Sequence, residues 1–179
     1  MAKTLNDEYK TRLEKLKKLR DNGVNPYPEK FNKLQLISEV LNFSEGQKVS
    51  TAGRILTIRE MGKICFCHIL DGTGKMQIVL KEGEISLKDF LKTFDPADFI
   101  GIDGELFKTQ KGETSILVKK YVLLGKALRP LPEKFHGLQD QEAKYRQRYL
   151  DLISNPETYK RFLFRSQFIR LLREFFLVE

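Results

Sequence analysis

The sequence predicts an α+β fold that is mainly β, with a five-stranded barrel between an N-terminal helix and C-terminal helices. From Lys48 onward, apolar and polar residues alternate with the two-residue period of half-buried strands. A helical pattern that begins at Ser86, a good capping residue, interrupts the strands once. The helix covers residues 86–94, and the five strand candidates are 49–59, 63–70, 75–80, 99–108 and 114–124.

This order of elements is typical of an OB-fold. An OB-fold is a partly open Greek-key barrel that binds oligonucleotides across its second and third strands. A five-stranded SH3-like barrel is the main alternative, and the helix before the fourth strand argues against it. We expect residues 48–125 to form the OB-fold domain.

The hairpin between the second and third strands has a predictable register. If Leu70 pairs with Lys75 across the turn 71–74, the apolar residues of both strands fall on one face. The same register places His68 opposite Gln77 on the other face, with Phe66 diagonal to that pair. The apolar rows are Cys65, Cys67 and Ile69 on one strand, and Met76, Ile78 and Leu80 on the other.

An amphipathic, basic helix is predicted before the barrel. Apolar residues recur every three or four positions over residues 6–21, and Gly23 is a natural terminator. Its other faces are either solvated or contact phosphates. Residues 1–47 are thus a basic helix and a lead-in, with a short helix or turn at 38–43. The helix cations are Lys10, Arg12, Lys15, Lys17, Lys18 and Arg20.

A linker and further helices are predicted after the barrel. Residues 126–138 are rich in proline, and Asp140 can cap a helix over 141–153. Asn155, Pro156 and Glu157 are a typical helix start. The helix that follows is apolar on more than one side, which predicts burial on more than one side. Residues 139–179 are therefore expected to pair with a second copy or to continue into a longer protein.

The composition favours a polyanionic partner over an acidic substrate pocket. The 179 residues include 32 Lys and Arg against 24 Asp and Glu, a formal net charge of +8, with a pI near 9.4. The plainer alternative is a soluble basic protein with no such partner.

The cysteines and the lack of long apolar runs indicate the cytoplasm. Cys65 and Cys67 point to the same face of one strand, which is too little for a metal site and poor geometry for a disulfide. We expect buried free thiols. No run reaches transmembrane length, and the start, MAKTLNDEYK, lacks the core of a signal peptide. A cytoplasmic location and no membrane partner are expected.

The sequence argues against an active site. The two histidines, His68 and His136, are far apart in sequence, and neither a nucleophile turn, a P-loop nor a metal-ligand cluster is recognisable. The Gly72-Thr73-Gly74 run is a hairpin turn rather than a phosphate loop. We expect no catalytic residue, no metal and no cofactor in this chain.

Four side chains at strand ends could meet on one surface. Phe66 could stack on a nucleobase or pack beneath a helix. Gln77, expected on an exposed strand face, could contact a base edge or be only solvated. Arg59 could pair with a phosphate or a base edge, and Glu113 could accept from a base. The plainer alternative is that both are ordinary surface residues. The combination of aromatic, amide, cation and carboxylate indicates a platform for single-stranded nucleic acid.

The chain resembles the amino-terminal part of bacterial lysyl-tRNA synthetases, which are class II aminoacyl-tRNA synthetases. The segments that carry the resemblance are GRILTIREMGKICF leading into DGTGKMQ, GELFKTQKGETSI, and KALRPLPEKFHGLQDQEAKYRQRYLDLISNP. The aspartyl and asparaginyl enzymes share the barrel and an RYLDL-like helix. The RPLP-x-KFHGL run with YRQRYLDL is similar to the lysine enzymes.

The resemblance implies roles for individual residues. Phe66 is expected to stack on an anticodon base, Gln77 to contact the central uridine, and Arg59 to contact that base or its neighbour. Glu113 is expected near a flanking base. Where the family often has a second basic residue beside the arginine, this chain has Ile58. His68 joins the anticodon set, and Lys10, Lys17 and Arg20 are expected to make weak tRNA backbone contacts.

The resemblance also implies a parent reaction, in which the full-length homodimer activates lysine with ATP and Mg²⁺ and transfers it to tRNA(Lys). The catalytic core is expected beyond Glu179, with the helices of residues 139–179 at the start of the catalytic and dimer region. This chain should therefore bind tRNA weakly and not aminoacylate by itself. A free-standing OB-fold module for single-stranded nucleic acid is the alternative, and a module that acts mainly in assembly through its last helix is a third possibility.

Overall fold

The computed structural model describes residues 5–131 and 140–178. The chain divides into two compact units, Met1–Pro130 and Leu131–Glu179. Most of the predicted linker, residues 132–138, lies outside the described residues, and so does His136.

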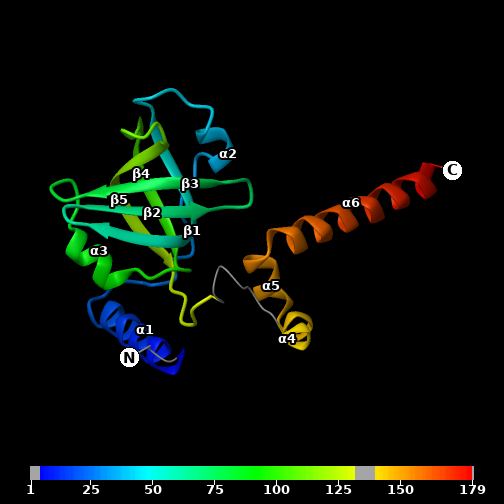
Figure 1. Cartoon of the computed structure of the whole chain (residues 1–179), viewed down its shortest axis with the longest axis horizontal. Helices are drawn as coiled ribbons and strands as arrows, with labels where there is room; N and C mark the ends of the chain where they lie inside the picture. The colour runs from blue at the N-terminus through cyan, green and yellow to red at the C-terminus, as the bar shows by residue number, and fades with distance from the viewer. Residues whose placement is uncertain (1–4, 132–139, 179) are drawn as a thin grey trace. The chain divides into compact units, whose positions relative to one another are not determined.

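The first unit contains a closed five-stranded barrel (Figure 1). Neighbouring strands follow the order β1-β2-β3-β5-β4, and β1 also pairs with β4 to close the barrel. The predicted OB-fold class is confirmed, although the barrel is closed rather than partly open. The strands are β1 (Lys48–Met61), β2 (Ile64–Leu70), β3 (Lys75–Lys81), β4 (Phe99–Lys108) and β5 (Thr114–Gly125).

The predicted hairpin register is confirmed. Leu70 pairs with Lys75, and His68 with Gln77. The turn between β2 and β3 is held by Asp71, whose Oδ1 accepts from the backbone N–H groups of Thr73 at 2.7 Å and Gly74 at 3.0 Å. Its Oδ2 accepts from Lys33 Nζ at 2.6 Å and from the N–H of Ile37 at 3.0 Å. One carboxylate therefore fixes both the turn and the segment that precedes the barrel.

Asp71 is expected to make stability depend on acid. Burial alone disfavours its ionised form, but the hydrogen bonds from Lys33, Thr73 and the backbone together lower its pKa below the usual 3.8. A lowered folded-state pKa contributes stability that is present above the unfolded pKa and is lost as the pH falls. The difference in unfolding free energy between wild type and Asp71→Asn should shrink from pH 7 to pH 3 in urea titrations. A constant difference over that range contradicts the prediction.

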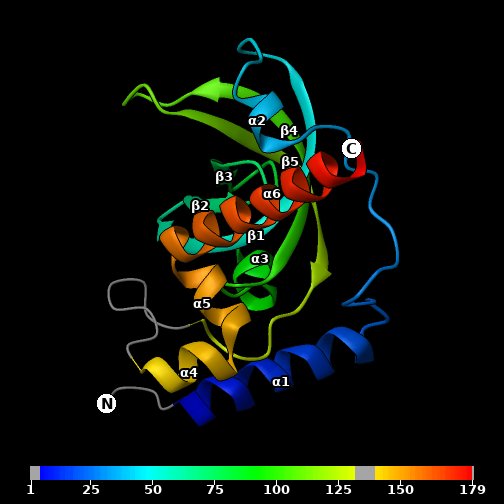
Figure 2. The ribbon, with the colours of Figure 1, turned by 90° about the vertical axis from the view of Figure 1, so that its right-hand side faces the viewer.

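Two short helices lie at opposite ends of the barrel (Figures 1 and 2). α2 (Ile37–Val40) lies near the β2–β3 turn, where Ile37 packs against Gly74. α3 (Leu87–Thr93) is capped by Ser86, whose Oγ accepts from Asp89 N at 3.3 Å. The rings of Phe90 and Phe94 stack with centroids 4.7 Å apart. Ser86 is therefore the helix cap, as predicted. The two short helices cover parts of the hydrophobic core that the strands alone would leave exposed.

The inward-facing cysteines are free thiols, as predicted. Cys65 and Cys67 are fully buried on β2, with their Sγ atoms 3.8 Å apart. They belong to the same core cluster as Ile69, Ile78 and the other inward side chains of the barrel. Their burial establishes that the alternate residues of β2 point outward.

α1 (Leu5–Asp21) packs on the barrel unit. The side that packs includes cations that the sequence predicts to be solvated or to contact phosphates. Leu16 and Leu19 are buried, as the apolar pattern predicts. Arg12 is also buried, and its Nη1 donates to the carbonyl oxygens of Pro96 at 3.0 Å and Ala127 at 3.1 Å. Lys15 pairs with Asp95 at 2.7 Å. The prediction for these two cations is wrong, because α1 contacts the polar loops that flank β4 and β5.

Lys126, the residue after β5, is a buried lysine that binds the segment between α3 and β4. Its side chain is fully buried, and Nζ donates to Thr93 O at 2.8 Å, Asp95 Oδ2 at 2.5 Å and Asp98 Oδ2 at 2.6 Å. Burial raises the pKa of Asp98, and the adjacent ammonium acts in the opposite direction. Sequence reasoning placed Lys126 in a linker and missed this cluster.

The second unit consists of three helices, α4 (Gln141–Arg146), α5 (Arg148–Ser154) and α6 (Pro156–Val178). Asp140 caps α4 by accepting from the N–H groups of residues 142 and 143, and Asn155 caps α6 in the same way, as predicted. The predicted single helix over 141–153 is wrong. Gln147, with φ −119° and ψ 51°, leaves the helical conformation and separates α4 from α5.

Apolar side chains of α6, for which the sequence predicts burial on more than one side, are exposed within the described unit, with Phe164 and Phe176 each 70% exposed. None of the described helices is both long enough and apolar enough to cross a membrane.

Candidate nucleic-acid interface

Four strands place polar and aromatic side chains on one outer face of the barrel. Residues 66, 68, 77 and 79 alternate with the buried cysteines, isoleucines and leucines of β2 and β3, so they share the opposite face. The strands β1, β2 and β3 lie side by side in Figure 1. We define the outer face as two cross-strand rows, Arg59–Phe66–Val79–Leu117 and Thr57–His68–Gln77–Ser115.

Phe66 lies at the centre of the first row. It pairs with Arg59 on β1 and with Val79 on β3, and it is half-buried. In the described part of the chain, Phe66 is not among the half-buried side chains packed on the core cluster. The rings of Phe90, on α3, and of Phe94, which follows α3, instead meet Tyr121, with ring centroids 5.5 Å apart in each pair. These contacts weigh against packing of Phe66 beneath α3, and the ring can stack on a planar ligand.

Gln77 lies in the second row but is not solvent-exposed. Only 8% of its surface is accessible, and Nε2 donates to Ser115 Oγ at 2.9 Å. The expectation of an exposed strand face is therefore wrong. β3 is flanked by β2 and by β5, and the parallel β5 supplies a buried serine beside the amide. A buried, hydrogen-bonded amide has a defined orientation, which a solvated one lacks.

His68 connects the second row to the turn between β4 and β5. Its Nδ1 lies 3.0 Å from Thr57 Oγ1, and its Nε2 lies 3.6 Å from Glu113 Oε1. The turn that carries Glu113 is closed by two hydrogen bonds to Thr109, one from the Glu113 N–H to Oγ1 and one from the Thr109 N–H to Glu113 O. The Glu113 carboxylate, half-exposed at 52%, is thereby held next to the imidazole.

The structure brings together five of the predicted site residues: Arg59, Phe66, His68, Gln77 and Glu113. It does not bring the α1 cations into this set. Lys10, Lys17 and Arg20 are exposed, but they lie on α1 and belong to neither cross-strand row.

Thr57 and Ser115 are members of the face that sequence reasoning missed. Thr57 faces His68 because the β1–β2 register shifts between Ile55 and Thr57. Ser115 faces Gln77 through the parallel pairing of β3 with β5, across 38 positions of sequence. The alternating pattern of β5 places Ser115 on one side of the strand, but only the topology identifies its neighbour.

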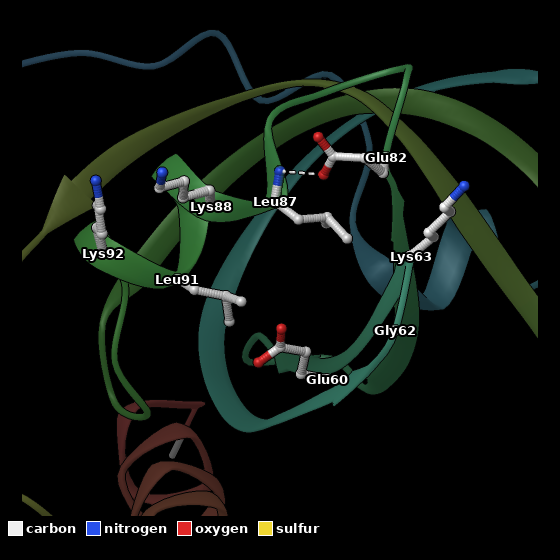
Figure 3. A pocket seen from close by; sticks show the side chains of 8 residues that line it. All are labelled: Glu60, Gly62, Lys63, Glu82, Leu87, Lys88, Leu91 and Lys92. Atoms are coloured by element: carbon white, nitrogen blue, oxygen red, sulfur yellow. Dashed lines mark hydrogen bonds between the residues drawn. The ribbon is translucent and has the colours of Figure 1, made fainter.

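An open cleft of about 520 Å³ lies elsewhere, between the β1–β2 turn and α3 (Figure 3). Leu87 and Leu91 point into it, and amino groups lie at its margin. The Glu82 carboxylate already has a hydrogen-bond partner, because its Oε2 accepts from the Leu87 N–H at 3.0 Å. The cleft contains none of the predicted site residues, and we assign no function to it. The lining residues are Glu60, Gly62, Lys63, Glu82, Leu87, Lys88, Leu91 and Lys92.

The side chains of this face can contact nucleobases. The face offers a ring for stacking, an amide, a guanidinium, an imidazole and a carboxylate, all of which can contact bases. Over residues 5–131 and 140–178, no group of three or more His, Cys, Asp or Glu side chains is placed to hold a metal ion.

Comparison with known proteins agrees with this assignment of the barrel. Residues 49–124 match the family model of the OB-fold nucleic acid binding domain. This range begins within β1 and ends within β5, so the match coincides with the barrel.

The whole chain is also similar to lysine–tRNA ligases. It is 46% identical over 177 residues to that of Carboxydothermus hydrogenoformans, 43% over 180 residues to that of Fervidobacterium nodosum, and 43% over 183 residues to that of Lactococcus lactis subsp. cremoris. Each comparison covers 96% of this chain but only 35–37% of the relative. The chain thus spans about a third of the length of these proteins and is related to them along nearly all of its own.

Proposed function

We propose that this chain, which carries an OB-fold nucleic acid binding domain and is related to lysine–tRNA ligases over 96% of its length, binds the anticodon of tRNA(Lys) as part of such a ligase. The observation that carries the proposal is the outer face, where Arg59, Phe66, His68, Gln77 and Glu113 converge on four adjacent strands. An anticodon is a short single strand whose bases are unstacked and presented by their edges, which such a face can contact.

Each side chain has a proposed role that follows from its chemistry. Phe66 stacks on one anticodon base, while the Gln77 amide contacts the edge of the central uridine. Arg59, paired with Phe66 across the strands, donates to that base or its neighbour. Glu113 accepts from a flanking base, and His68 holds the Glu113 carboxylate at the border of the face.

The parent reaction is proposed for the longer protein. In it, lysine is activated with ATP and Mg²⁺ and transferred to tRNA(Lys), in the part of the relatives that this chain does not match. The exposed apolar side chains of α6 support a role for the second unit in a homodimer. We place this enzyme in the cytoplasm.

A titration with two RNAs tests the proposal. The 179-residue chain is mixed at one salt concentration with a U-rich anticodon stem-loop and with a stem-loop whose loop bases are scrambled. Preference for the U-rich loop is expected. Equal affinities contradict anticodon recognition and favour the alternative, a sequence-independent module for single strands.

The α1 cations are expected to add affinity that does not depend on RNA sequence. Lys17 is exposed on α1, so Lys17→Ala should weaken binding to both stem-loops equally and reduce the slope of log K against log salt by about 1. Binding is measured at four salt concentrations, with Lys119→Ala, which alters an exposed lysine paired to Glu84, as the control. A change in the preference between the loops contradicts this role.

A further inference from the structure

We propose that Ser115 is a positioning residue that determines base specificity, because it sets which end of the Gln77 amide is presented to the ligand. This inference rests on the proposed function, since it concerns the base that Gln77 contacts. Ser115 lies on β5, is completely buried, and faces Gln77 in the parallel register of β3 and β5.

The single proton of the Ser115 hydroxyl decides the orientation. Oγ donates to the carbonyl oxygen of Glu113 at 3.3 Å, so only its lone pairs are directed at Gln77. An amide that faces lone pairs must present its NH₂ end, and Nε2 donates to Ser115 Oγ at 2.9 Å. The reverse orientation would place the amide oxygen against the hydroxyl oxygen with no proton between them.

The Glu113 carbonyl that takes the proton is itself fixed. It accepts from the Thr109 N–H at 3.0 Å within the β4–β5 turn, and Thr109 Oγ1 accepts from the Glu113 N–H at 3.1 Å. The backbone of the turn, Ser115 and Gln77 therefore form one directed chain of hydrogen bonds. Because each hydrogen bond restricts the next, the amide is oriented in advance of ligand binding.

The consequence is a preference for bases that carry a ring N–H. With Nε2 held by Ser115, the other end of the amide is Oε1, which only accepts hydrogen bonds. Uracil offers a donor at N3, whereas cytosine has a lone pair at the same position. Where a fixed Oε1 faces ring position 3, it accepts from uracil and opposes the lone pair of cytosine, whereas an amide free to rotate can bind either pyrimidine.

The test compares two stem-loops that differ only in uridine or cytidine at the central anticodon position. For the wild-type 179-residue chain, a preference for uridine of roughly tenfold or more is expected. In Ser115→Ala the amide can turn over, so the ratio should fall toward 1. Ser115→Thr keeps the hydroxyl and should keep the ratio, which a purely structural role for the serine does not predict.

The outcomes separate this inference from the proposed function. A wild-type preference that persists unchanged in Ser115→Ala overturns the role of Ser115 and leaves anticodon binding intact. A wild-type chain without any preference overturns the proposed function. Thermal unfolding shows whether each variant is folded. If the alanine variant is not, Ser115→Cys replaces the hydroxyl with a weaker donor and acceptor of similar size, and the same loss of preference is expected.

Discussion

Replacing Phe66 with alanine is expected to weaken binding of a U-rich anticodon stem-loop by about 1–3 kcal/mol, the typical contribution of one aromatic ring stacked on a base. The ring is half-buried in the middle of the outer face, between Arg59 and Val79, so its removal takes away the stacking surface while the barrel core keeps its contacts. Isothermal calorimetry or fluorescence anisotropy at fixed salt gives the affinity.

Phe99→Ala is the matched control for this loss. Phe99 is 42% exposed on β4, and its ring lies 4.2 Å from the Arg54 guanidinium carbon, outside both cross-strand rows. Its removal should leave affinity unchanged, and Phe66→Tyr should retain it because the ring is kept. If Phe66→Ala binds as tightly as wild type, the ring has a structural role and the anticodon stacks elsewhere.

Lys126→Met is expected to produce a large loss of stability, about 3–5 kcal/mol, because it leaves the buried carboxylate of Asp98 without its cation. Asp98 is fully buried, with its Oδ2 2.6 Å from Lys126 Nζ. Asp95 forms an ion pair with the same ammonium group. Chemical denaturation at pH 7 measures the effect. Lys119→Met, which breaks the exposed pair with Glu84, is expected to cost less than about 1 kcal/mol.

The loss in Lys126→Met should depend on pH in a defined direction. Burial already raises the pKa of Asp98, and removal of the ammonium shifts it further upward. A carboxyl whose folded-state pKa is raised destabilises the fold at high pH and ceases to do so when it is protonated. The difference between variant and wild type should therefore narrow as the pH is lowered. A second change, Asp98→Asn, should restore part of the stability at pH 7, and the absence of any recovery contradicts this account.

The barrel could be predicted from sequence because each local signal agreed with the others. Alternation located every strand, Ser86 located the helix between the third and fourth, and two apolar rows left one register for the β2–β3 hairpin. That register pairs His68 with Gln77, as the folded barrel does. Local patterns succeed here because a slip of one residue would turn a whole apolar row outward.

The predictions that failed for the buried polar side chains depended on neighbours distant in sequence, whereas the break between α4 and α5 lies at Gln147 itself. Nothing local marks Arg12 or Lys126 as buried, since their partners lie on the loops around β4 and β5. Gln77 was expected to be exposed because the serine beside it comes from a strand 38 positions later. The roles of the outer-face residues in binding stay predictions until RNA is titrated.

Because β3 pairs with β5, the outer face is complete only after β5 has been synthesised and has joined the barrel. A chain synthesised only as far as Lys108 contains Phe66, His68 and Gln77, yet it lacks the strand that supplies Ser115 and the carboxylate of Glu113. Long-range pairings form late, because the entropy of closing the intervening loop must first be overcome. A nascent polypeptide that ends before β5 therefore has the aromatic ring without the oriented amide, and the proposed interface is complete only when the barrel is.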